Sequence, residues 1–393
     1  MSTLHTRILG IDFENPFLLA SAPPTALIES IDQAFEMGWG GAVLKTITPD
    51  DLEMEEASPR YAALYDKKHI IGFQNIELLS HQTVQYWCDG IKYLKQKHPH
   101  KVIIASIMAP VQKEQWQYLV QRLNNTPADA YELNFSCPHG MPEKGIGMAI
   151  GTDAQVSAQI TQWVKQVAQK PVFVKLTPNV TDIASIAHAV EEAGADGLAA
   201  INTVQGFMGI DLHTLRPVLD VNGKTTFGGC SGPIVRPIGL RCVAQIRQVS
   251  SLPILGQGGI SSWEDAAQYL AVGADAVQVC TEVMLHGYQV IGPMLKGLQT
   301  YLEEKKFADI QTLQNRAISL ISTHENLPKQ SVAYPQINQE ICVRCGKCIT
   351  ICQESEHQAL RLEDGYVQVE QARCVGCGLC RLVCSKQAIG IKQ

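Results

Sequence analysis

Residues 171–203 read PVFVKLTPNVTDIASIAHAVEEAGADGLAAINT, and this stretch decides the fold. Two short runs of β-forming residues, 171–176 and 197–203, flank residues 181–193, whose apolar positions recur at the spacing of one helix face. A strand, a helix and a second strand in this order predict two parallel strands joined by a crossover helix.

The same order repeats through the first part of the chain. Further helical patterns occupy residues 153–169 and 262–272, and the complete set of strand-like runs is 17–22, 41–46, 102–108, 130–136, 171–176, 197–203, 253–259 and 276–282. Eight strands alternating with helices over about 300 residues predict an α/β fold, a (β/α)8 TIM barrel. A doubly wound open sheet is the main alternative, but no strand run is followed by G-x-G-x-x-G opening a helix. The same observation argues against a nicotinamide site in this chain.

Composition is that of an ordinary globular protein. The chain has 393 residues, 46% of them hydrophobic and 18% charged, with a formal net charge of −6. This acidic balance argues against a nucleic-acid partner. The apolar run VIIASIMAPV is too short to span a bilayer, and MSTLHTRILG lacks the pattern of an export signal. We therefore expect a cytoplasmic protein without a membrane partner.

The 13 cysteines are unevenly distributed, with eight of them between Cys342 and Cys384. These eight follow the pattern C-x2-C-x2-C-x3-C twice, which is typical of a ferredoxin with two [4Fe-4S] clusters. In that pattern the fourth cysteine of each run ligates the other cluster. We assign one cluster to Cys342, Cys345, Cys348 and Cys384, and the other to Cys374, Cys377, Cys380 and Cys352.

A zinc site is the alternative reading of these cysteines, but zinc uses four ligands with a long gap between two pairs. The proline that usually follows the fourth cysteine is replaced by Gln353 and Ser385, which affects the expected turn rather than the ligands. We predict a barrel over residues 1–310, a linker over 311–335 and a two-cluster ferredoxin-like domain over 336–393. Such clusters transfer single electrons, so the barrel must hold a group that uses them.

Polar residues gather at the carboxyl ends of the predicted barrel strands, the rim at which barrel enzymes place their active sites. The glycine-rich GQGG at 256–259 and CTE at 280–282 follow the seventh and eighth strands, where barrels often bind phosphate. A phosphate site, the neighbouring Lys45 and Lys175, and a ferredoxin tail together indicate FMN. The two lysines would offset the charge that a reduced flavin carries near N1 and its C2 carbonyl.

Six motifs carry a resemblance over essentially the whole chain: ASAPPT, GWGGAVLKT, NFSCPHGM, KLTPNVTDI, INTVQGFMG and GQGGI, followed by the paired cysteine runs. Together they resemble the dihydropyrimidine dehydrogenases, most closely the bacterial catalytic subunit. The resemblance implies FMN in a dihydroorotate-dehydrogenase-like barrel and reduction of the 5,6 double bond of uracil or thymine. It also implies a partner, an FAD-containing subunit that oxidises NADH, in a hetero-oligomer such as a heterotetramer.

The resemblance also assigns residues. Cys137 matches the active-site acid, and the pyrimidine contacts are Asn75, Asn134, Ser136, Asn202 and Thr203. The flavin contacts are Ser21, Lys45, Thr46, Lys175, Gly232, Gln257, Gly258, Gly259, Cys280 and Thr281, where Gln257 replaces a threonine of the family. Amide side chains both donate and accept hydrogen bonds, so they can pair with an uncharged pyrimidine.

Cys137 could by itself be a small core residue, a metal ligand or a disulfide partner, but its polar neighbours favour a chemical role. A thiol titrates near pH ~8.5 and is mostly protonated at neutral pH, so it can act as a general acid. The following HGMPEKGIG, residues 139–147, is interpreted as a lid over the bound base.

Two other functions stay open at this point. A dihydroorotate dehydrogenase shares the barrel and the flavin, but its substrate carries a carboxylate that requires a cation or a cradle of amides. Here the matching segment GFQNIELLS has no glycine after Asn75. The second alternative is a non-catalytic electron carrier that only stores a flavin.

Overall fold

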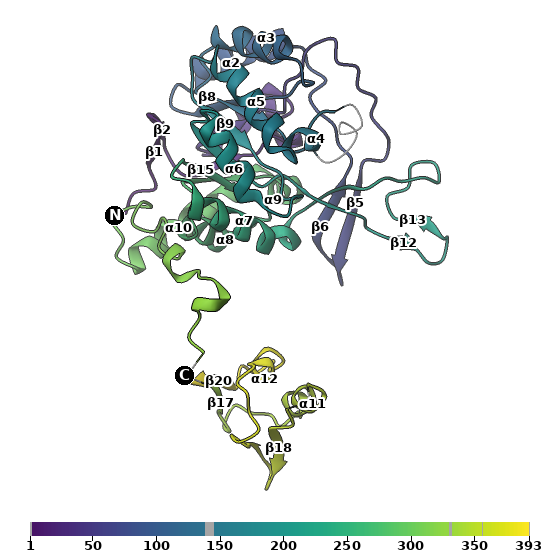
Figure 1. Ribbon diagram of the computed structural model, residues 1–393, viewed down its shortest axis with the longest axis vertical. Helices are drawn as coiled ribbons and strands as arrows, with labels where there is room; N and C mark the ends of the chain where they lie inside the picture. Colours follow the sequence, from purple (N-terminus) through teal and green to yellow (C-terminus); the bar gives the residue numbers. More distant parts are fainter. Residues whose placement is uncertain (1, 138–144, 330–331, 356, 393) are drawn as a thin grey trace. The chain divides into compact units, whose positions relative to one another are not determined.

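A computed structural model describes residues 2–137, 145–329, 332–355 and 357–392 (Figure 1). The chain divides into two compact units, Met1–Leu320 and Ile321–Gln393, and each is described here by itself. Residues 311–320, which lie in the predicted linker, belong to the first unit. Asn315 and Ala317 donate backbone hydrogen bonds to Leu270 and Ala271 of that unit. The bounds of the linker stay a prediction.

Eight parallel strands close into a barrel in the order β10-β15-β16-β3-β4-β7-β8-β9. They are β3 (Phe17–Leu19), β4 (Gly41–Val43), β7 (Val102–Ile107), β8 (Ala130–Asn134), β9 (Val172–Lys175), β10 (Gly197–Ala200), β15 (Ile254–Gln257) and β16 (Ala276–Val279). Each lies within one of the eight runs expected from the sequence. The predicted (β/α)8 barrel is confirmed.

Helices surround the strands (Figure 1). They are α1 (Ile28–Glu36), α2 (Val84–Lys97), α3 (Lys113–Asn124), α4 (Met148–Gly151), α5 (Ala154–Lys165), α6 (Ile183–Glu192), α7 (Arg236–Val249), α8 (Trp263–Ala271), α9 (Thr281–His286) and α10 (Ile291–Glu304). Helix α6 shows how the sequence sets the start of a helix and its buried face. Asp182 caps it by accepting hydrogen bonds from the amides of Ala184 and Ser185. Its stripe of Ile183, Ile186, Ala187 and Val190 is buried against the barrel unit.

The interior of the barrel is apolar toward the amino-terminal ends of its strands, and every strand contributes to this layer. The inward residues are Leu18, Val43, Ile104, Ala130, Phe173, Ala199, Leu255 and Ala276. The hairpin of β1 (Thr6–Ile8) and β2 (Ile11–Phe13) adds Ile8 and Phe13 to the same cluster. This packing fixes the barrel and leaves its opposite, carboxyl-terminal end for other chemistry.

Three aspartates hold the amino-terminal ends of barrel strands. Asp129, Asp196 and Asp275 each immediately precede a strand. Each accepts a hydrogen bond from the first or second amide of a neighbouring strand, at Ile103, Val172 and Ile254 respectively. Each also pairs with a basic side chain of a helix: Lys95, Lys165 and Arg247. The repetition at this face indicates a role in stability.

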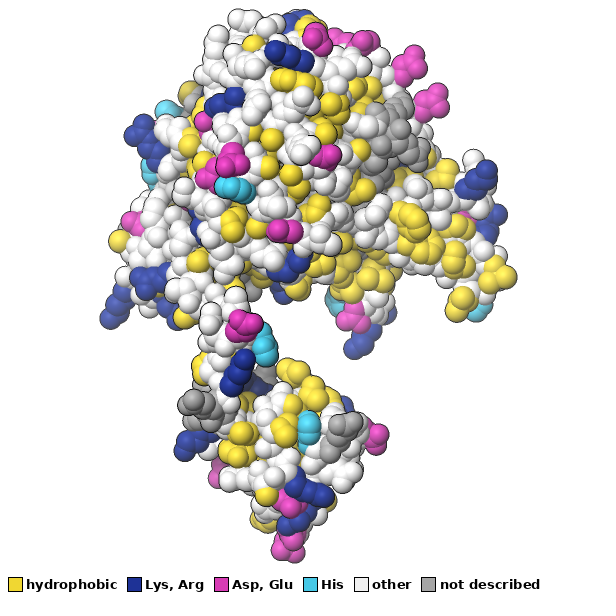
Figure 2. Space-filling model, viewed as in Figure 1, with side chains coloured by type: hydrophobic (Ala, Val, Ile, Leu, Met, Phe, Trp, Pro, Cys, Tyr) yellow, Lys and Arg dark blue, Asp and Glu magenta, His cyan; other side chains and the backbone are white. Residues whose placement is uncertain are grey.

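A second, antiparallel sheet lies outside the barrel, in the order β11-β14-β6-β5, and the sequence analysis did not predict it. Its strands are β5 (Tyr61–Asp66), β6 (His69–Asn75), β11 (Val204–Gly206) and β14 (Gly228–Ser231). Between β11 and β14 the chain makes an excursion that carries β12 (Ile210–Asp211) and β13 (Arg216–Pro217). Hydrophobic side chains are exposed on this excursion (Figure 2): Phe207, Ile210, Leu212, Leu215, Val218 and Phe227.

In its described residues, the second unit contains two small antiparallel sheets and two α-helices. Strand β17 (Tyr334–Ile337) pairs with β20 (Ile389–Lys392), and β18 (Leu360–Glu363) pairs with β19 (Tyr366–Val369). Helices α11 (Lys347–Glu354) and α12 (Leu379–Leu382) each begin just after a glycine with positive φ, Gly346 and Gly378. Their small apolar core includes the buried Cys348 and Cys380.

Candidate active site

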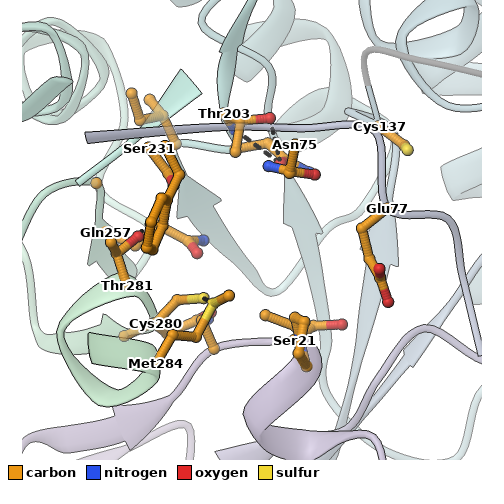
Figure 3. Close-up of a pocket in the computed structure, with 18 of the residues that line it drawn as sticks. Ser21, Asn75, Glu77, Cys137, Thr203, Ser231, Gln257, Cys280, Thr281 and Met284 are labelled. Carbon is orange, nitrogen blue, oxygen red and sulfur yellow. Dashed lines mark hydrogen bonds between the residues drawn. The ribbon is translucent and has the colours of Figure 1, made fainter. Parts of the chain in front are cut away.

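A cavity of about 140 Å³ opens at the carboxyl-terminal ends of the barrel strands. All residues predicted to contact the pyrimidine or the flavin, and the predicted acid Cys137, line this cavity, with the exception of Ser136. The outer sheet contributes one wall through Tyr61, Phe73, Asn75 and Cys230. In Figure 3, Asn75, Glu77 and Cys137 lie to one side of this cavity, and Gln257, Cys280 and Thr281 lie to the other.

Amide and hydroxyl groups form a connected network at the ends of β8 and β10. Asn134 Nδ2 donates to Thr46 Oγ1 at 2.9 Å, and Asn134 Oδ1 accepts from Ser136 Oγ at 3.0 Å. Asn202 Nδ2 donates to the same Ser136 Oγ at 2.7 Å, and its Oδ1 accepts from the Thr203 amide at 2.7 Å. Ser136 is fully buried, so the structure places it behind the two asparagines, where it orients both. Its predicted contact with substrate stays a prediction.

Lys45 is paired with a carboxylate that the sequence analysis did not single out. Its Nζ donates to Glu77 Oε1 at 3.0 Å, and Arg60 Nε lies 3.0 Å from Glu77 Oε2. Both Lys45 and Glu77 line the cavity. Burial, followed by the charge of Glu77, raises the pKa of the neighbouring Tyr61 well above its usual value, so Tyr61 stays a neutral hydroxyl.

Lys175 faces a different carboxylate, Glu132, in the interior of the barrel. Lys175 Nζ lies 3.6 Å from Glu132 Oε1, and Gln278 Nε2 donates to Glu132 Oε2 at 2.8 Å. Glu132 is completely buried, and Gln278 is nearly so. Each lysine that lines the cavity is therefore matched by one carboxylate.

The opposite end of the cavity is built for close backbone approach. Gly232, Gly258 and Gly259 have φ values of +89°, +118° and +75°, which L side chains rarely adopt. An added Cβ at Gly259 would lie 2.7 Å from the carbonyl oxygen of Gly232 and 2.8 Å from the amide nitrogen of Arg236. The backbone there forms a cradle that a side chain would fill, as a phosphate site requires.

Two side chains beside the cradle are polar or ionisable. Thr281 Oγ1 donates to Ser231 Oγ at 3.0 Å. Burial raises the pKa of the Cys280 thiol to about 11, although the charges of Lys175 and Lys45 partly oppose this. Cys280 is therefore a neutral thiol in the wall of the cavity near pH 7.

Cys137 follows β8 and lines the cavity, with 6% of its surface exposed. Its carbonyl oxygen accepts a hydrogen bond from the Met148 amide at 2.9 Å, which ties the residue to the start of α4. The predicted lid spans residues 139–147, of which 139–144 lie outside the described residues. The interpretation of this segment as a lid stays a prediction.

Several cavity residues were missed by the sequence analysis: Tyr61, Phe73, Glu77, Cys230, Ser231, Gln278 and Met284. Glu77 and Gln278 could have been predicted, because side chains two residues apart in an extended chain point to the same side. Glu77 lies two residues after the predicted Asn75, and Gln278 lies two residues before the predicted Cys280, so each shares a face with a predicted residue.

The second unit encloses two further cavities of about 20 Å³ each. One is lined by Cys342, Cys345, Cys348 and Cys384, and the other by Cys352, Cys374, Cys377 and Cys380. These are the same two sets of four that the spacing predicts. The amides of Ala359 and Ala388 donate to Cys352 Sγ and Cys384 Sγ at 3.3 and 3.2 Å, the kind of contact that tunes an iron–sulfur cluster.

Within the described part of the chain, no helix is long and apolar enough to cross a membrane.

Comparison with known proteins gives two family matches. A model described as dihydroorotate dehydrogenase matches residues 3–302, and one described as a 4Fe-4S dicluster domain matches residues 335–391. The chain is 37% identical over 361 residues to the NAD-dependent dihydropyrimidine dehydrogenase subunit PreA of Escherichia coli (strain K12), covering 91% of this chain and 87% of the relative. It is 36% identical over 339 residues to the chloroplastic dihydropyrimidine dehydrogenase (NADP(+)) of Arabidopsis thaliana, covering 83% and 80%. It is also 35% identical over 317 residues to the catalytic subunit of dihydroorotate dehydrogenase B (NAD(+)) of Pyrococcus abyssi, covering 81% of this chain and 100% of the relative.

Proposed function

The chain belongs to the dihydropyrimidine dehydrogenases within the dihydroorotate dehydrogenase family, and we propose that it reduces uracil or thymine to the 5,6-dihydropyrimidine, reversibly, at a bound FMN. The relatives are oxidoreductases that act on related ring systems, so the choice between pyrimidine bases and dihydroorotate has to come from the cavity.

The balance of charge in the cavity carries the proposal. Among the described residues that line it, Lys45 and Lys175 are the only cations, and each faces a carboxylate, Glu77 or Glu132. An anionic substrate such as orotate would need a cation for its carboxylate, and both of these cations are already paired with a carboxylate. Uracil and thymine carry no charge, and their N–H groups can donate to a carboxylate or an amide oxygen. The cavity therefore favours the neutral base.

The residues at the other end of the cavity fit a flavin phosphate and ring. The cradle at Gly232, Gly258 and Gly259 leaves backbone room for a phosphate. Gln257 Nε2 is buried and has no hydrogen-bond partner among the described residues, so it offers a free donor to a ring acceptor. FMN, when bound, accepts single electrons from iron–sulfur clusters and supplies a hydride to carbon. The remaining proposed flavin contacts are Ser21, Lys45, Thr46, Lys175, Cys280 and Thr281.

The proposed base contacts hold the ring and supply a proton. Asn75, Asn134, Asn202 and Thr203 pair with the carbonyl and N–H groups of the base. Asn134 and Asn202 are held by Ser136, so their amides are fixed before substrate binds. The Cys137 thiol donates its proton to C5 of the pyrimidine as hydride reaches C6, and the thiolate recovers it in the reverse direction.

Electrons reach this site through the second unit in our proposal. Cys342, Cys345, Cys348 and Cys384 would hold one [4Fe-4S] cluster, and Cys352, Cys374, Cys377 and Cys380 would hold the other. Clusters of this kind would supply single-electron transfer. The source of the electrons is NADH, oxidised on a separate FAD-containing partner in a hetero-oligomer. The name of the bacterial relative, a subunit, supports a partner chain. A cytoplasmic location stays a prediction.

Flavin and iron content, measured together with turnover of uracil, thymine and orotate under an artificial reductant, test the proposal. We expect FMN, eight irons per chain as two clusters require, and turnover of uracil or thymine but not orotate. Turnover of orotate in preference to uracil would establish a dihydroorotate dehydrogenase. Flavin without turnover of any of the three would establish an electron carrier.

A further inference from the structure

One hydrogen bond crosses the interior of the barrel beneath the cavity. It joins Gln278 Nε2 to Glu132 Oε2 at 2.8 Å. Strands β16 and β8, which carry these residues, are four places apart in a closed ring of eight, so the bond spans opposite walls. Glu132 lies directly above the apolar layer, because Ala130, two residues earlier on the same face of β8, belongs to that layer.

The cross-barrel bond fixes one carboxylate oxygen and aims the other at Lys175. Glu132 Oε1 has no hydrogen-bond partner among the described residues, and its nearest cation is Lys175 Nζ at 3.6 Å. That separation is within ion-pair range but longer than a hydrogen bond. The carboxylate therefore holds the ammonium by charge without using its donors.

The two lysines of the cavity differ in this respect. Lys45 Nζ donates to Glu77 Oε1 at 3.0 Å, whereas no hydrogen bond from Lys175 Nζ is found among the described residues. An ammonium carries three N–H donors. Lys175 thus keeps its donors for a ligand in the cavity, and Glu132 compensates its charge from below.

We propose that Glu132 is a positioning residue that fixes Lys175 Nζ from inside the barrel and, through this ion pair, lowers the reduction potential of the flavin. The inference rests on the proposed function, because it requires a flavin in the cavity. An ammonium beside a ring that gains negative charge favours the reduced form. A permanent carboxylate behind that ammonium opposes this effect, so the barrel sets the potential by pairing the two charges.

Removal of an ion pair that serves stability alone should leave the reduction potential of the flavin unchanged. Asp275 is the comparison, since its carboxylate is partly buried and paired with a cation, Arg247 Nη2 at 2.9 Å. It lies at the amino-terminal end of β16, away from the cavity. Removal of its charge should lower thermal stability and leave the flavin unaffected.

The test is the flavin midpoint potential of the full-length protein, measured by reductive titration against reference dyes. In Glu132→Gln, which keeps the shape and an acceptor for Gln278, the ratio of reduced to oxidised flavin at a fixed potential should rise at least tenfold, about 30 mV for a two-electron couple. Lys175→Met should move the potential in the opposite direction, and Asp275→Asn should leave it unchanged.

Glu132→Asp retains the charge one methylene further from Lys175 and should raise the potential by less than Glu132→Gln. If Glu132→Gln shifts the flavin midpoint potential no more than Asp275→Asn does, the inference is overturned and the proposed function stays intact. Loss of flavin from both Glu132 variants would also overturn it, since Glu132 would then be a structural requirement of the barrel. Absence of flavin from the wild type would instead refute the proposed function.

Discussion

Replacement of Glu77 by Gln should reverse the preference of the cavity for a neutral base. Glu77 is the carboxylate that offsets Lys45 and Arg60, at 3.0 Å from each. Its neutralisation leaves Lys45 and Arg60 without their shared carboxylate and so adds one unit of positive charge to the cavity wall.

The magnitude follows from Coulomb's law. At an effective dielectric constant of about 20, two unit charges about 6–8 Å apart interact by about 2–3 kcal/mol. The attraction gained between the added positive charge and the orotate carboxylate should tighten orotate binding by about 30- to 150-fold. Uracil carries no charge, so its affinity should change little. The ratio of the two affinities should therefore change by about 30- to 150-fold.

Titration of flavin absorbance with uracil and with orotate measures both affinities directly. Glu56→Gln is the matched control. Glu56 also pairs with Arg60, at 3.6 Å, and accepts from the Leu78 amide, but it does not line the cavity. It should lower stability without changing the ratio of affinities. Tight orotate binding by the wild type, or an unchanged ratio in E77Q, would refute the argument from charge.

Three further predictions concern the acid, the cradle and the electron supply. Cys137→Ala should leave reduction of the flavin by the clusters intact and slow pyrimidine turnover by about 10²–10⁴-fold, as removal of a general acid does. Stopped-flow spectroscopy measures the reduction of the flavin, and steady-state rates measure pyrimidine turnover. Turnover at the parental rate would eliminate the assignment of Cys137 as the acid. Gly259→Ala should yield a folded protein that retains little flavin after gel filtration, because its Cβ would lie 2.7 Å from the carbonyl oxygen of Gly232; full flavin retention would contradict the cradle. The isolated chain should not couple NADH oxidation to uracil reduction until an FAD-containing partner is added, and steady coupled turnover without one would reveal a nicotinamide site in this chain.

The barrel could be predicted because its strands and helices obey simple local rules. Each strand run is short, apolar and followed by a helical pattern, and the helix after β9 begins at a capping aspartate, Asp182. The outer sheet escaped prediction for the opposite reason. Strand β6, His69–Asn75, mixes polar and apolar residues and lies between two barrel strands, where the repeating unit predicts a loop and a helix. Its hydrogen-bond partner β14 is more than 150 residues away, as the Gly229–Asn75 pairing shows.

Most of the site could also be predicted, because carboxyl ends of parallel strands must meet at one rim. What the sequence does not contain is the direction in which a polar side chain at that rim points. Ser136 and Asn134 are two residues apart, yet Asn134 lines the cavity and Ser136 supports it from behind. Glu132 was overlooked because a charged residue within an apolar strand becomes meaningful only when its cross-barrel partner, Gln278, is known.

The ion pairs Lys45–Glu77 and Lys175–Glu132 have different electrostatic effects in the cavity. Glu77 binds Lys45 at hydrogen-bond distance, so that pair presents little net charge to whatever lies beside Asn75 and Cys137. Glu132 holds Lys175 at 3.6 Å and leaves the ammonium donors uncommitted, so this pair can respond when negative charge develops in the cavity. A substrate without charge and a cofactor that gains charge require these two different arrangements. One tight pair and one loose pair satisfy both requirements within a single buried site, because buried charges are tolerated only when each has a partner.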